Sequence, residues 1–212
     1  MELYGYFRSS TAYRVRIALN VKGLDCRHIP LSILAGEHKG AEYLKKNPQG
    51  FVPYFTDGDV AMGQSMAMLE YLEEEYPEPA LLPADAMGRA RVRQLCGIIA
   101  CDIHPVDNLR VLKYIVSEFG ASDEQKTAWY HHWILEGFKA FEILLQDGKS
   151  GDFCHGDDVS FADLCLVPQV YNARRFQCPM ADFPNITRIT ENCNRLDAFI
   201  QALPENQVDY KE

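Results

Sequence analysis

The sequence predicts an α/β domain at the N-terminus followed by an all-helical domain, within a chain of 212 residues. Two observations predict this fold class. As far as the proline-rich residues 77–86, strand-like and helix-like runs alternate in the order β-α-β-α-β-β-α. Beyond them helical periodicity alone remains, and no convincing strand follows. We therefore expect one domain at residues 1–80, a second at residues 87–212 and a linker between them.

Each element of the N-terminal domain follows from a short local pattern. Alternating aromatic residues indicate strands, apolar residues at helical spacing indicate helices, and glycine or proline marks their ends. The predicted elements are a strand at 2–7, a helix at 11–22, a strand at 25–31, a short helix at 40–47, an extended segment at 47–55, a turn at 56–59, a strand at 60–64 and a helix from Ser65 that stops before Pro77. The first three elements form a crossover and predict a parallel strand pair, whereas the later hairpin is antiparallel.

The C-terminal domain is predicted from four helical segments, at residues 88–119, 123–147, 160–173 and 184–202. Pro105 falls inside the first segment, so we expect a kink there because proline lacks the peptide N–H. The pair Ser160 and Asp163 resembles a capping box. We interpret this pair as structural, since apolar residues follow it at helical spacing.

The composition argues against several classes of function. Acidic residues outnumber basic ones, 30 to 21, and the net charge of −9 argues against binding of nucleic acid or of anionic membranes. No apolar run approaches the roughly 20 residues that cross a membrane, and the first ten residues lack the pattern of a secretory signal. The seven cysteines include no C-x-x-C pair, so we expect reduced thiols, no metal site and a cytoplasmic location.

The segment FRSSTAYRVRIAL near the N-terminus is the first candidate site. Ser9, Ser10 and Thr11 lie at the predicted start of a helix, where unpaired peptide N–H groups are equivalent to roughly half a positive charge. Arg8 and Arg14 add positive charge nearby. A helix cap needs one hydroxyl rather than three, so the cluster either only caps the helix or also holds an anion or a thiolate.

Two further segments of the N-terminal domain offer groups to a ligand. Pro53 precedes a predicted strand, where a proline is either an ordinary edge residue or cis. In the cis case Val52 would turn its peptide group outward and could pair with an extended peptide. Ser65, after Gln64, is expected as the N-cap of the next helix. An amide and a hydroxyl at a helix N-terminus would also suit a bound carboxylate.

The helical domain contains polar residues that could face a ligand. His104, Asn108 and Arg110 cluster near the predicted kink, and Arg174 and Arg175 follow each other on a later helix. Such residues form either a solvated polar face or, together with the other arginines, an anion pocket. The residue pattern leaves both interpretations open.

Several of these motifs together resemble the zeta class of the glutathione transferase superfamily. FRSSTAYRVRIAL is similar to the class signature S-S-C-x-x-R-V-R-I-A-L, with Thr11 in place of the cysteine. The segments NPQGFVP, LEYLEEEYPEPALLP and ADLCLVPQVYNARRF and the HP pair also resemble that class, so the similarity spans nearly the whole chain. The resemblance implies a glutathione transferase fold: a thioredoxin-like glutathione-binding domain, an all-α substrate-binding domain, a homodimer and glutathione as cofactor.

The resemblance also implies roles for individual residues. Ser9 or Ser10 would face the glutathione sulfur as catalytic residues, with Arg8 beside them. Val52, before a cis Pro53, would pair with the cysteinyl backbone of glutathione. The implied cofactor-binding residues are Ser10, Thr11, Gln49, Val52, Pro53, Gln64, Ser65, His104 and Asn108, and the implied substrate-binding residues are Arg8, Arg110 and Arg175. Because the class mechanism uses the thiol of glutathione, loss of the signature cysteine need not abolish activity.

The activity implied by the resemblance is cis–trans isomerisation of a maleyl keto acid through reversible addition of the glutathione thiolate. Maleylacetoacetate, from aromatic amino acid catabolism, is the first expectation, and maleylpyruvate is the alternative. A conjugating transferase or dehalogenase would use the same activated thiolate, and a noncatalytic binding protein would share the fold. The three arginines favour the isomerase, because a hydrophobic electrophile needs no such set. The intact hydroxyl cluster argues against a noncatalytic role.

Overall fold

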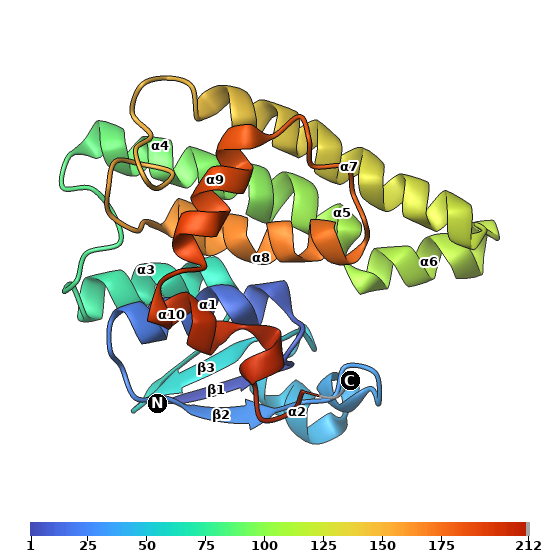
Figure 1. Ribbon diagram of the computed structural model, residues 1–212. Coiled ribbons are helices and arrows are strands. Elements are labelled where there is room, and N and C mark those ends of the chain that lie inside the picture. The colour runs from blue at the N-terminus through green and yellow to red at the C-terminus, as the bar shows by residue number, and fades with distance from the viewer. Residues whose placement is uncertain (211–212) are drawn as a thin grey trace. The chain divides into compact units, whose positions relative to one another are not determined.

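The computed structural model describes residues 1–210 and divides into two compact units. The first unit joins residues 1–80 to the C-terminal segment from Asn194 onward, and the second spans Leu81–Cys193. The C-terminal segment therefore departs from the expected helical domain at 87–212. Its helix α10 (Asp197–Ala202) packs on α1 (Ser10–Val21) of the first unit (Figure 1). Asn20 in α1 reinforces this packing by donating a side-chain hydrogen bond of 2.9 Å to the carbonyl of Ala198.

The first unit contains a four-stranded mixed sheet in the order β2-β1-β3-β4 (Figure 1). The strands are β1 (Glu2–Gly5), β2 (Arg27–Pro30), β3 (Tyr54–Asp57) and β4 (Val60–Gly63). β1 pairs with β2 in parallel, whereas the β1–β3 and β3–β4 pairs are antiparallel. The structure thus confirms the predicted crossover and the predicted hairpin.

Helices cover the sheet of the first unit and bury its apolar side chains. The remaining helical elements of this unit are the 3₁₀ turn η1 (Glu37–Lys39), α2 (Ala41–Lys46), α3 (Ser65–Glu75) and the 3₁₀ turn η3 (Pro204–Asn206). α1 and α3 pack against each other, and Val15, Ile17, Phe55 and Leu72 are completely buried between these layers. Burial of these side chains fixes the position at which α1 and α3 begin, and two of the three candidate ligand segments of this domain lie at these helix starts.

The second unit is helical over its described length, apart from loops. Its elements are α4 (Ala86–Gly97), the π-helical segment η2 (Ile98–Ile103), α5 (His104–Asp107), α6 (Leu109–Phe119), α7 (Asp123–Leu144), α8 (Phe161–Arg175) and α9 (Pro184–Cys193). α8 is almost wholly buried and packs against α4 and α9. The helix predicted at 184–202 is divided, because the chain leaves the second unit after Cys193.

The helix predicted at 88–119 is interrupted near Pro105, as expected, but in a more elaborate way than a kink. The backbone widens into the π-helical segment before Pro105, whose ring has no N–H to donate to the preceding turn. The helix then breaks at Asn108, whose ψ of 143° is extended. This break exposes the N-terminus of α6, where Asn108 and Arg110 lie.

The capping box at α8 is confirmed as structural. The Asp163 carboxylate is completely buried and accepts hydrogen bonds of 2.8 Å from both the N–H and the hydroxyl of Ser160. Its other oxygen accepts the N–H of Cys154 at 2.9 Å, which ties the preceding loop to the helix. The buried carboxylate is thus occupied by structural partners.

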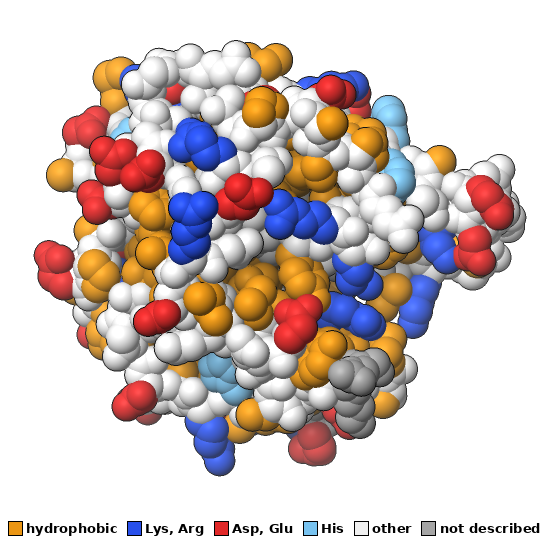
Figure 2. Space-filling view, in the orientation of Figure 1, with side chains coloured by type: hydrophobic (Ala, Val, Ile, Leu, Met, Phe, Trp, Pro, Cys, Tyr) orange, Lys and Arg blue, Asp and Glu red, His pale blue; other side chains and the backbone are white. Residues whose placement is uncertain are grey.

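No helix within residues 1–210 has both the length and the apolar character needed to cross a membrane. On the face drawn in Figure 2, acidic and basic side chains are interspersed among apolar ones.

Candidate active site

The hydroxyl cluster lies at the N-terminus of α1, and each of its members has a different environment. Ser9 is the N-cap, and its Oγ accepts the N–H of Ala12 at 3.3 Å. Ser10 is the first helical residue and is only 5% exposed. Thr11 is half-buried and lies beside Ser9, with 2.9 Å between the two hydroxyl oxygens. Ser9 therefore makes the N-cap hydrogen bond of α1.

Thr11 connects this helix start to the peptide that precedes Pro53. Its Oγ1 donates a hydrogen bond of 3.0 Å to the carbonyl oxygen of Val52. A carbonyl only accepts, so the Thr11 proton is used there, and the bond between Ser9 and Thr11 must use the Ser9 proton. The result is a chain of hydrogen bonds from Ser9 through Thr11 to Val52.

The peptide bond between Val52 and Pro53 is cis, which decides between the two alternatives left open by the sequence. The preceding residue, Phe51, is held by two side chains of the α2 region. Tyr43 Oη and Asn47 Nδ2 donate to the carbonyl of Phe51 at 2.5 and 2.8 Å. Burial raises the pKa of Tyr43 to about 12, so its hydroxyl stays a donor at neutral pH.

The start of α3 differs from the expectation that Ser65 is its N-cap. Gln64 occupies that position with φ 70° and ψ 108°, and Ser65 is the first helical residue. Residues other than glycine rarely adopt such a positive φ, and they do so mostly where function requires it. The Gln64 side chain donates to Gln49 Oε1 at 2.7 Å, so two of the residues implied by the resemblance lie together.

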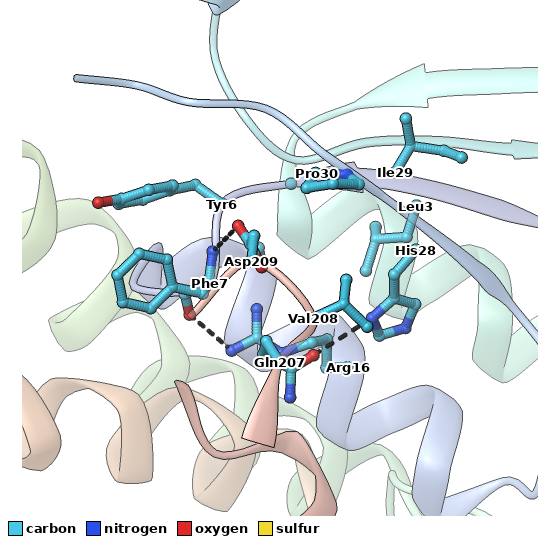
Figure 3. A pocket seen from close by; sticks show the side chains of 12 residues that line it. Leu3, Tyr6, Phe7, Arg16, His28, Ile29, Pro30, Gln207, Val208 and Asp209 are labelled. Atoms are coloured by element: carbon cyan, nitrogen blue, oxygen red, sulfur yellow. Dashed lines mark hydrogen bonds between the residues drawn. The ribbon is translucent and has the colours of Figure 1, made fainter. Parts of the chain in front are cut away.

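Arg8 lies on the loop between β1 and α1 and rests against aromatic rings. Its guanidinium carbon is 5.3 Å from the ring centre of Phe7 and 5.9 Å from that of Tyr6. The loop itself is fixed on both sides of Phe7 (Figure 3): Asp209 accepts its N–H at 2.9 Å, and Arg16 donates to its carbonyl at 3.0 Å. Arg8 therefore projects from a restrained backbone.

In the second unit, His104, Asn108 and Arg110 lie together at the helix break. Asn108 is the N-cap of α6, and its Oδ1 accepts the N–H of Arg110 at 3.1 Å. Its Nδ2 lies 3.4 Å from Nε2 of His104. The Arg110 side chain is exposed. The side chains of His104 and Asn108 therefore lie side by side, Arg110 contacts Asn108 through its backbone N–H, and Asn108 is also a structural residue.

Arg175 lies at the last turn of α8 and is exposed. Its guanidinium carbon is 4.5 Å from the ring centre of Phe176, which stacks on Tyr130 with 3.8 Å between ring centres.

Asp107, the last residue of α5, is a buried acid of the same unit. It is 6% exposed, and neither carboxylate oxygen has a hydrogen-bond partner within the described chain. Burial raises the pKa of Asp107 to about 8.

Arg14 is a residue of this region whose burial the sequence analysis did not anticipate. Only 1% of its surface is exposed, and its Nη1 donates to Ser65 Oγ at 3.4 Å. A sequence signal existed, because Ser10, Arg14 and Ala18 follow one another at i, i+4 spacing and all three are buried. A charged residue in the middle of such a stripe indicates a buried cation.

Comparisons with known proteins agree with this geometry. The family model described as glutathione S-transferase, N-terminal domain, matches residues 3–80, and that for the C-terminal domain matches residues 112–197. A probable maleylacetoacetate isomerase of Vibrio cholerae is 47% identical over 98% of this chain and 97% of its own. A solved holo structure of maleylpyruvate isomerase, described as a bacterial zeta-class glutathione S-transferase, is 45% identical, has a TM-score of 0.98 and covers 100% of both chains.

The chain belongs to the zeta class of the glutathione S-transferase family. The expected glutathione transferase fold is therefore confirmed. A further family structure, a maleylacetoacetate isomerase from Anaeromyxobacter dehalogenans, has dicarboxyethyl glutathione and citrate bound in its active site. It is 40% identical to this chain, with a TM-score of 0.89, and covers 100% of this chain and 97% of its own.

Proposed function

We propose that this zeta-class protein is a glutathione-dependent cis–trans isomerase of a maleyl keto acid, most directly of maleylacetoacetate to fumarylacetoacetate. The observation that supports this most strongly is the chain of hydrogen bonds from Ser9 through Thr11 to Val52 at the N-terminus of α1. It places hydroxyl groups at a positive helix end, next to a peptide group suited to an extended ligand. The names of the relatives point to the same reaction.

Glutathione supplies a thiol, whose thiolate adds to the double bond, allows rotation about the resulting single bond and is then released. The residues of α1 favour the charged form of that thiol. On binding of glutathione, either Ser9, in exchange for its hydrogen bond to Thr11, or Ser10 donates a hydrogen bond to the sulfur, and the helix N-terminus adds its partial positive charge. Both effects lower the pKa of the thiol and so raise the fraction of thiolate at neutral pH.

The first unit recognises the peptide part of glutathione. Val52 offers its peptide group to the cysteinyl backbone, and Thr11 holds that carbonyl in place. Gln64 and Ser65 bind the γ-glutamyl carboxylate at the N-terminus of α3. Three more residues complete the proposed cofactor site: Gln49, which touches Gln64, and His104 and Asn108, which touch each other.

Three arginines bind the substrate. A maleyl keto acid has two carboxylates, and a protein of net charge −9 needs local cations to hold them. Arg8, Arg110 and Arg175 provide planar guanidinium groups for this purpose, and Arg8 lies next to the thiolate position. The same donors stabilise the negative charge that develops on the keto oxygen during addition.

The remaining features of the proposal follow from the same family membership. The functional unit is a homodimer in the cytoplasm, acting in aromatic amino acid catabolism. Residues 1–80 form the glutathione-binding part, and the helical residues that follow form the substrate-binding part. Maleylpyruvate is the second candidate substrate, supported by the 45% identity to a maleylpyruvate isomerase.

A comparison of three substrates tests the proposal. We expect the highest kcat/KM for maleylacetoacetate, a lower value for maleylpyruvate and the lowest for conjugation of a chlorinated aromatic electrophile. A higher kcat/KM for maleylpyruvate would reassign the substrate. A preference for the electrophile would replace the isomerase by a conjugating transferase or dehalogenase, and glutathione binding without any turnover would indicate a noncatalytic protein.

A further inference from the structure

Arg14 is a buried cation whose hydrogen-bonding capacity is largely unused. Its side chain is 1% exposed, and its guanidinium has five N–H donors and no acceptor. Nη1 donates to Ser65 Oγ at 3.4 Å, whereas Nε and Nη2 have no hydrogen-bond partner within residues 1–210. A buried charge without an anionic partner is costly, so its retention requires an explanation.

Arg16, two residues along the same helix, shows how this chain satisfies a buried guanidinium. It is 3% exposed, and it donates to the carbonyls of Phe7 and Ala202 at 3.0 and 3.1 Å. One of these bonds is drawn in Figure 3. Arg16 thus has a structural role in joining the β1–α1 loop to α10. Arg14 has no comparable set of carbonyl acceptors.

The surroundings of Arg14 are electropositive. Its partner Ser65 is the first residue of α3, a helix of 11 residues with no acidic residue in its first turn. The unpaired N–H groups of that turn have the same sign of charge as the guanidinium. Gln64, just before it, is held at a φ of 70°. An anion bound at this place would stabilise both like charges at once, and strained residues such as Gln64 cluster at ligand sites.

The hydrogen bond from Arg14 also determines what Ser65 can do. Because Nη1 donates to Ser65 Oγ, one lone pair of that oxygen is occupied and the guanidinium polarises the hydroxyl. The proton of Ser65 is then available as a donor to a different acceptor. A serine arranged in this way is a donor suited to a carboxylate.

We propose that Arg14 is a positioning residue for the carboxylate end of glutathione, acting through Ser65 without touching the ligand. The inference rests on the proposed function, which puts the γ-glutamyl carboxylate at Gln64 and Ser65. Arg14 orients the Ser65 hydroxyl toward that carboxylate and adds an unscreened positive charge beneath it. The stability cost of the unpaired charge is offset when the ligand binds.

The test measures ligand affinity by calorimetry in wild type and in Arg14→Met, with three tripeptides. They are glutathione, 4-aminobutyryl-cysteinylglycine, which lacks only the γ-glutamyl α-carboxylate, and glutaryl-cysteinylglycine, which lacks only the α-amino group. We expect Arg14→Met to weaken the two ligands that have the carboxylate by roughly ten- to a hundredfold, the range for a charge-assisted contact. Binding of 4-aminobutyryl-cysteinylglycine should change less than about twofold.

Thermal unfolding without ligand provides a second readout, because a positioning role and a structural role predict opposite changes in Tm. Replacing an unpaired buried charge by an apolar side chain should leave the Tm of Arg14→Met equal to or above that of wild type. Arg14→Lys should recover part of the lost glutathione affinity, since it restores the charge without the planar fork. In a Ser65→Ala background, Arg14→Met should cost less affinity than in wild type, because the two residues act together.

Arg16→Met is the matched control, since Arg16 is equally buried but already paired. It should lower the Tm and change the affinity of all three tripeptides by similar factors. The inference is overturned if Arg14→Met, like Arg16→Met, lowers the Tm and weakens all three tripeptides by similar factors. It is also overturned if the ratios of the three affinities in Arg14→Met equal those in wild type. Arg14→Gln replaces Arg14→Met under the same criteria if the latter does not fold. If wild type itself binds all three tripeptides equally, the carboxylate site of the proposed function is wrong. That result is distinguishable from failure of the Arg14 inference, because it appears without any substitution.

Discussion

Thr11 Oγ1 donates a hydrogen bond of 3.0 Å to the carbonyl oxygen of Val52, 41 residues further along the chain. This bond joins the start of α1 to the peptide before Pro53, and so joins the two segments that we assign to the cysteinyl part of glutathione. Because Ser9 in turn donates to Thr11, the side chain at position 11 influences both the Val52 carbonyl and the Ser9 hydroxyl. The hydroxyl in place of the class cysteine thus connects two segments of the proposed site.

Thr11→Val tests this connection, since valine keeps the shape of threonine but cannot donate. We expect the KM for glutathione to rise and kcat/KM to fall by roughly three- to tenfold, the value of one neutral hydrogen bond. Steady-state kinetics at varied glutathione concentration measure both constants. Thr11→Ser is the matched control and should stay near wild type. A loss in Thr11→Ser with no loss in Thr11→Val would show that packing of the methyl group matters and the hydroxyl does not.

Alanine variants of Ser9 and Ser10 separate the thiolate donor from the helix cap. Ser10 is only 5% exposed, so we expect Ser9 to exchange its hydrogen bond to Thr11 for one to the sulfur when glutathione binds. Ser9→Ala should then raise the pKa of the bound thiol and slow turnover by roughly ten- to a thousandfold, as for loss of one oriented donor. Ser9→Ala also removes the N-cap, at a cost of about 1 kcal/mol in stability. Thiolate absorbance against pH gives the thiol pKa. A larger shift in Ser10→Ala would transfer the role to Ser10.

Arg110 and Arg175 are exposed, so their removal tests binding, and thermal unfolding of each variant checks the effect on folding. Arg110→Ala and Arg175→Ala should each lower kcat/KM for the maleyl keto acid by roughly ten- to a hundredfold, the value of one charge-assisted contact. Lysine at either position should restore only part of the activity. Arg174→Ala, on the same helix turn and also exposed, is the control and should leave kcat/KM unchanged. Unchanged kinetics in the Arg110 and Arg175 variants would remove the dicarboxylate assignment.

Asp107 gives the stability of the protein a defined pH dependence. Burial raises its pKa from 3.8 to about 8, so between these values the folded state retains a proton that the unfolded state has lost. The free energy of unfolding should therefore decrease as pH rises through this window, by at most about 1.4 kcal/mol per pH unit from this group. Denaturant unfolding at pH 5 and pH 8 checks this. Asp107→Asn has no carboxylate to titrate, so it should gain stability relative to wild type at pH 8. An identical dependence of the free energy of unfolding on pH in both proteins would contradict this role of Asp107.

The sequence predicts the first unit well because its elements are marked locally. Gly23 and Pro77 end helices, and a single turn fixes the hairpin, so the strand and helix order follows without tertiary information. The destination of the C-terminal helix could not be predicted in this way. Its pattern shows that Phe199 and Ala202 face a core, but only tertiary packing shows that this core belongs to the first unit.

The candidate site also combines features that a local sequence pattern predicts with features that depend on tertiary packing. The residue types at Ser9, Pro53 and Gln64 lead to predicted ligand contacts at helix and strand starts, and these contacts stay predictions. The bond from Thr11 to Val52 spans two segments distant in sequence, so no local pattern contains it. Likewise, the unpaired state of Arg14 depends on what surrounds it rather than on its neighbours in the chain.

The thiol requirement tests the central claim most directly. Nuclear magnetic resonance can follow conversion of the cis keto acid to its trans product while a thiol titration follows the total glutathione. We predict many turnovers per glutathione with no net loss of thiol, and no isomerisation when S-methylglutathione replaces glutathione. Consumption of one glutathione per substrate, or equal turnover with S-methylglutathione, would contradict the account.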